Sequence, residues 1–62
     1  MMWLSEVMMQ NHDINSFSEL EKVISEKAKS GEIFFRMDVK PTYPDTPEDW
    51  EDRLETAFSS TR

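Results

Sequence analysis

The feature that most constrains this fold is one stretch, residues 32–40, which alternates as a β-strand does. Its four inward positions are Ile33, Phe35, Met37 and Val39. Pro41 ends it, because proline cannot donate to a sheet. A lone strand leaves its backbone groups unsatisfied, so it needs a neighbour. The neighbour is either residues 1–9 or a second chain, which would form a homodimer or be captured on the strand edge.

Residues 2–10 are compatible with two interpretations. In a helix, one face would carry Trp3, Leu4, Val7 and Met8. In a strand, the alternation of apolar residues is interrupted by Ser5. Methionine, leucine and glutamate favour helix, so we predict a short helix over residues 2–10 and keep the strand as the alternative.

A longer helix is predicted over residues 17–30. Ser16 and Glu19 have the spacing of a capping box, and Gly31 stands where a helix-terminating glycine belongs. The expected buried face consists of Phe17, Leu20, Val23, Ile24 and Ala28. The opposite face has charges of both signs, as is typical of a solvated surface.

The last helix is predicted over residues 47–58. Thr46 would cap it, Pro47 would occupy its first position, and Asp49 would complete a capping box. The expected buried face consists of Trp50, Leu54, Ala57 and Phe58. The sequence thus predicts a single small α+β domain covering residues 1–62, in the order helix–helix–strand–helix.

The same helix has a strongly acidic outer face. Its carboxylates, spaced three, four and seven residues apart, are Glu48, Glu51, Asp52 and Glu55. Residues 45–55 hold six acids against Arg53, a net charge of −5 out of −6 for the chain. Arg53 is expected to pair with Asp49, four residues before it. Neighbouring like charges are unfavourable, so the face serves either for solubility or for contact with a basic partner.

A proline-rich connector, residues 40–47, joins the strand to this helix and is expected to be extended. Tyr43 lies between two of its prolines, where it can pack on the core or stand exposed as an anchor. The candidate partner-binding residues are Glu48, Glu51, Asp52, Glu55, Asp45 and Tyr43.

No motif for catalysis or for a cofactor is present in the sequence. The single histidine, His12, lies in a predicted turn with no nucleophile placed beside it by any motif. The acids of residues 45–52 lack the glycine and alternating oxygen ligands of a calcium loop. One glycine and no cysteine exclude a glycine-rich phosphate loop and thiolate metal sites. We therefore expect no enzyme activity, no metal and no cofactor.

The profile favours a small acidic protein that binds and inhibits or regulates a larger protein. Its acidic helix face would occupy a basic surface, such as one that binds nucleic acid, as small phage and mobile-element proteins often do. One alternative is an antitoxin or immunity-type partner that covers a toxin through its strand edge, and another is a structural homo-oligomer subunit. The charge argues against direct binding to nucleic acid or to a membrane. Glu6 and the lack of basic residues near the N-terminus argue against a secretory signal, so we expect a cytoplasmic protein.

Overall fold

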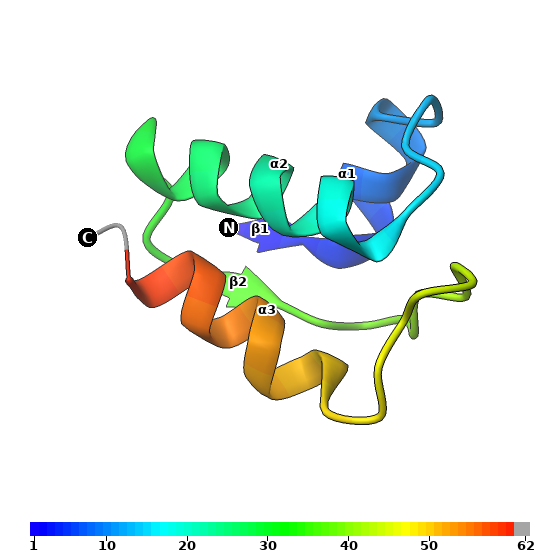
Figure 1. Ribbon diagram of the computed structural model, residues 1–62. Helices are drawn as coiled ribbons and strands as arrows, with labels where there is room; N and C mark the ends of the chain where they lie inside the picture. The colour runs from blue at the N-terminus through cyan, green and yellow to red at the C-terminus, as the bar shows by residue number, and fades with distance from the viewer. Residues whose placement is uncertain (61–62) are drawn as a thin grey trace.

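The computed structural model describes residues 1–60 as two short strands and three helices. The elements are β1 (Met2–Trp3), α1 (Leu4–Gln10), α2 (Phe17–Lys29), β2 (Phe35–Arg36) and α3 (Trp50–Ser59). In Figure 1 the strands run between α2 above and α3 below. The α+β class is confirmed, and the order differs from the predicted one because a strand precedes the first helix.

The two strands form a parallel pair. Met2 lies opposite Phe35 and Trp3 opposite Arg36, and the Met2 N–H donates to the Phe34 carbonyl at 2.9 Å. Parallel strands need a long crossover connection, and here α1 and α2 together supply it. The neighbour of the second strand is therefore the N-terminal segment of the same chain.

The N-terminal segment combines the two interpretations of residues 2–10. The predicted helix is wrong for residues 2–3, which are extended, whereas residues 4–10 are helical. Met2 is buried at 5% exposure while Trp3 is exposed, as expected where successive strand residues point to opposite faces.

The predicted strand over residues 32–40 is too long, since only Phe35–Arg36 is paired as a strand. The physical reason lies in its neighbour: α1 begins at Leu4, so β1 offers only two residues to pair with. Phe35 packs against the core, but Ile33 and Val39, expected to face inward with it, are 58% and 39% exposed.

Helix α2 begins and ends as the sequence predicts, to within one residue. The Ser16 hydroxyl accepts the Glu19 N–H at 3.2 Å, which is the N-cap half of the predicted capping box. At the other end Gly31 has φ 113°, a conformation that side chains disfavour. The N–H groups of Gly31 and Glu32 donate to carbonyls of the last helical turn, at Ala28 and Lys27, in a Schellman arrangement.

Helix α3 begins at Trp50, three residues later than predicted, and the predicted Thr46 cap is wrong. Asp49 occupies the N-cap position without a side-chain hydrogen bond, and the buried Thr46 hydroxyl has no partner among the described residues. Residues 43–46 form a turn in which the Thr46 N–H donates to the Tyr43 carbonyl at 3.0 Å, and residues 48–49 form a second turn before the helix.

The core lies where α2 and α3 pack against each other and the strand pair (Figure 1). Its buried side chains are Met2, Leu4, Val7, Ile14, Phe17, Leu20, Ile24, Ala28, Leu54 and Phe58. The predicted inner face of α2 is confirmed at four positions, with Val23 only partly buried. In α3, Leu54 and Phe58 are buried, while Trp50 and Ala57 are partly buried against the same cluster.

Candidate partner-binding face

The acidic face, defined as Glu48, Glu51, Asp52 and Glu55, is exposed at all four positions. Three of these residues lie on α3, and Glu48 lies in the turn that precedes it. The helix places Leu54 and Phe58 in the core, so the carboxylates between them in sequence face outward. The predicted clustering of acids on the outer side of this helix is thus present, although Glu48 lies outside the helix.

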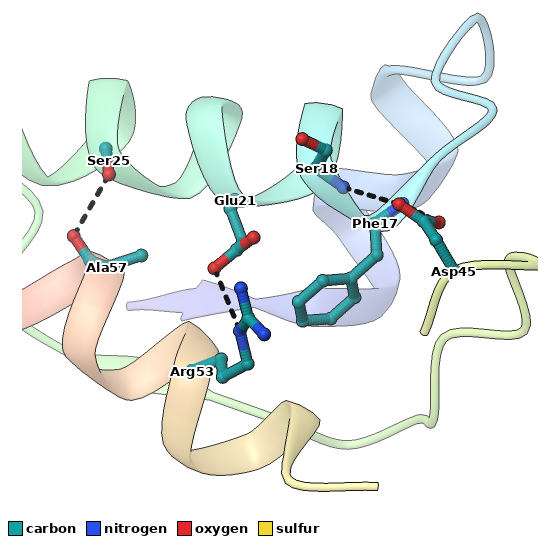
Figure 2. Close-up of polar contacts among 7 residues, drawn as sticks. All are labelled: Phe17, Ser18, Glu21, Ser25, Asp45, Arg53 and Ala57. Carbon is teal, nitrogen blue, oxygen red and sulfur yellow. Dashed lines mark hydrogen bonds and ion pairs between the residues drawn. The ribbon is translucent and has the colours of Figure 1, made fainter. Parts of the chain in front are cut away.

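The one base in this stretch, Arg53, does not pair with Asp49 as predicted. Its Nε lies 3.6 Å from the Glu21 carboxylate on α2, and its guanidinium lies 6.0 Å from the centre of the Phe17 ring. Figure 2 shows Arg53 reaching across from α3 to α2. An ion pair this exposed stabilises the fold little. More important for the charge of the acidic face is which helix Arg53 contacts: its ion pair is with Glu21 of α2.

Asp45, a candidate contact residue, binds within the chain. Its carboxylate accepts the N–H groups of Phe17 and Ser18, at 2.6 and 3.3 Å (Figure 2). These are the first two residues of α2, whose amides have no partner inside the helix. The hydrogen bond from the Phe17 amide, followed by that from Ser18, lowers the pKa of Asp45 below its usual value.

Asp38 likewise accepts hydrogen bonds at the start of a helix, in this case α1. Its two carboxylate oxygens accept the hydroxyl of Ser5 at 2.6 Å and the backbone N–H of Ser5 at 3.0 Å, in the first turn of α1. These bonds, with the hydroxyl contributing most, lower the pKa of Asp38. Sequence reasoning missed both contacts, because the aspartates are 33 and 28 residues away from the amides they bind.

Tyr43 is partly buried and packs against the core, the first of the two arrangements considered for it. Desolvation, and next the charge of Glu19, raise the pKa of its hydroxyl. A neutral, half-buried tyrosine offers only part of its ring to a partner.

Beside α3 lies a feature that the sequence did not indicate, an apolar groove of about 390 Å³. We define the apolar groove by Ile33, Phe34, Phe35, Met37 and Phe58, and its lining also includes Glu55 and Ser59. Phe35 and Phe58 form its floor with ring centres 5.4 Å apart. The signal in the sequence was present as Ile33-Phe34-Phe35, but an extended strand would have placed Ile33 in the core.

The structure also places the histidine and the acidic residues that were considered for catalysis or metal binding. His12 is exposed in the turn after α1. Within residues 1–60 no three or more histidine, cysteine, aspartate or glutamate side chains gather as metal ligands would. The described helices include none that is long and apolar enough to cross a membrane.

Comparisons with known proteins bring no further assignment. No family model matches the chain, and searches of curated proteins and of solved structures gave no match. Function is therefore inferred from the residues and their geometry alone.

Proposed function

We propose that this protein is a non-catalytic inhibitor or regulator that binds a basic surface of a larger protein through its acidic face. Glu51, Asp52 and Glu55 would make the central contacts, with Glu48 at one end. A basic surface that otherwise binds nucleic acid is the kind of target this charge fits.

The observation that carries the proposal is the direction of Arg53. Within the described chain its ion-pair partner is Glu21 of α2, and it forms no ion pair with a carboxylate of α3. Like charges three and four residues apart destabilise a helix by a few tenths of a kcal/mol per pair. The chain tolerates this cost on an exposed face, which is expected if the face attracts a partner of opposite charge.

Attraction of this kind acts mainly on the rate of association. A surface of one sign steers an oppositely charged partner and raises association rates by roughly 10–10³-fold at low salt. Exposed charges are screened over about 8–10 Å at physiological ionic strength, so the effect weakens as salt rises. Salt dependence is therefore the signature expected of this function.

Not all the candidate residues support the proposal equally. Asp45 is engaged with the amides of α2 and Tyr43 is partly buried, so we restrict the contact surface to the acidic face. The antitoxin-like alternative relied on a long strand edge, and it has less support because β2 has two residues and pairs within the chain.

A charge reversal with a matched control tests the proposal. The test variant is E51K/D52K/E55K, and the control is E6K/D13K/E26K, which reverses three exposed acids elsewhere. Each replacement adds two charges, so both variants move the formal net charge from −6 to 0. Circular dichroism should show that both fold, since exposed substitutions usually change stability by less than about 0.5 kcal/mol each.

The measurement is affinity capture from host lysate at low and physiological salt, followed by the affinity of each variant for the protein recovered. We expect wild type and the control to retain a salt-sensitive basic partner, and the test variant to lose it. Equal capture by both variants, independent of salt, contradicts the proposed function.

A further inference from the structure

The apolar groove is open where its lining residues are most apolar. Ile33 and Phe34 are 58% and 61% exposed, although each is a large hydrophobic side chain. Adjacent exposed apolar residues on a monomer mark an interaction surface more often than single ones do. The volume of about 390 Å³ lies near the lower end of the range of ligand pockets, a size that suits one or two side chains of a partner.

The groove combines a pair of packed aromatic rings with one charged side chain. Phe35 contacts the buried Phe58, so an inserted group would lie against two packed aromatic rings. Glu55 lines the groove, is exposed, and has no ion-pair partner among residues 1–60. Glu55 is also a member of the acidic face, so the groove and the acidic face share this carboxylate.

We propose that the apolar groove binds a partner segment in which a bulky apolar side chain stands next to lysine or arginine. The apolar side chain would lie over Phe35 and Phe58, and the basic group would reach Glu55 and the acidic face beyond it. A polar occupant would leave Phe34 in water, and an acidic one would be repelled by Glu55. This inference rests on the proposed function and names the chemistry of the partner.

Three synthetic peptides provide the probe. The first has leucine and phenylalanine flanked on each side by two lysines, the second replaces the apolar pair with serines, and the third replaces the lysines with glutamates. Binding is followed by the amide shifts of the full-length, isotope-labelled protein in NMR titrations. We expect the first peptide to shift the amides of Phe34, Phe35 and Glu55 and to bind about tenfold more tightly than either of the others.

Two variants and one control locate the site on the protein. Phe34→Ser removes the most exposed aromatic of the groove and should abolish the preference for the apolar peptide, while Glu55→Gln should reduce the preference for lysine over glutamate. Met9→Ser removes a side chain that is 75% exposed on α1, away from the groove, and should change nothing.

The outcomes separate this inference from the proposed function. If the serine peptide binds as tightly as the apolar one, the groove is not the site, although binding to the acidic face stands. If the glutamate peptide binds as tightly as the lysine peptide, or if no groove amide shifts, the inference is overturned. If the apolar lysine peptide is preferred but charge reversal leaves partner capture unchanged, the groove assignment stands and the proposed function fails.

Discussion

Helices α2 and α3 pack against the same core yet are specified in different ways. The ends of α2 have local signals, with Ser16 accepting an amide at the start and Gly31 reversing the chain at the end. The local signals for α3, Thr46 and Pro47, do not mark its start, since the helix begins at Trp50 without a side-chain cap. The difference shows that the residue types of a capping pattern do not by themselves fix where a helix starts.

The largest expected effect is common to the two helices. Leu20 on α2 and Leu54 on α3 are both fully buried. Replacing either with alanine should cost about 2–5 kcal/mol of unfolding free energy, which is comparable with the whole stability of a domain this small. Both variants should be largely unfolded by circular dichroism.

Exposed Met9→Ala is the control for these core variants and should melt like wild type. A Leu54→Ala protein that also melts like wild type, next to an unfolded Leu20→Ala protein, would mean that α3 is not part of the cooperative core.

A smaller effect is expected in the pH dependence of stability, to which the starts of α1 and α2 should contribute and the start of α3 should not. In the folded state the pKa of Asp38 is lowered from 3.8 by hydrogen bonds from the Ser5 hydroxyl and then the Ser5 amide, and the pKa of Asp45 is lowered from 3.8 by those from the Phe17 and Ser18 amides. Their contribution to stability is therefore fully present above about pH 4 and is lost as pH falls through the lowered folded values. Chemical denaturation from neutral pH to about pH 2 gives the free energy of unfolding of wild type and D38N/D45N. Wild type should be the more stable at neutral pH, and the difference should disappear in the acidic range.

The matched variant for this pH experiment is Asp49→Asn, at the start of α3. Asp49 makes no side-chain cap, so its stability curve should run parallel to that of wild type. A pH dependence unchanged in D38N/D45N would show that the two aspartates do not stabilise the helices they contact.

The smallest effect compares the two hydroxyls at predicted helix starts. Ser16→Ala removes a cap and should cost about 0.5–2 kcal/mol. Thr46→Val removes a buried hydroxyl that has no partner among the described residues, so it should be neutral or slightly stabilising. Thermal melts of the two variants give the comparison, and a Thr46→Val loss equal to that of Ser16→Ala would restore the predicted cap.

These contrasts explain how much of the fold could be predicted from the sequence. The span and inner face of α2 were predictable because periodicity and end signals agree within one short segment. The length of β2 was not, because it depends on how many residues β1 leaves extended before Leu4 begins α1. The start of α3 was not given by its local signals, since Thr46 and Pro47 are followed by a turn at residues 48–49 and the first helical residue is Trp50.

The candidate site was predictable in its charge and not in its shape. The exposure of Glu51, Asp52 and Glu55 follows from their spacing relative to Leu54 and Phe58. The pairing of Arg53 with Glu21 joins two helices whose approach no local pattern specifies. The apolar groove likewise depends on residues 33–37 lying beside α3, which only the assembled fold produces.

The two distant aspartates also affect the order in which the chain can fold. Helices α1 and α2 leave the ribosome first, but the carboxylates that complete their N-termini arrive with Asp38 and Asp45, and the partner of β1 arrives with residues 35–36. Contacts between segments so far apart in sequence slow folding, because the intervening loop must close before they form. Synthesis of the first half should therefore yield a frayed pair of helices, and stable structure should form only once most of the chain has been released.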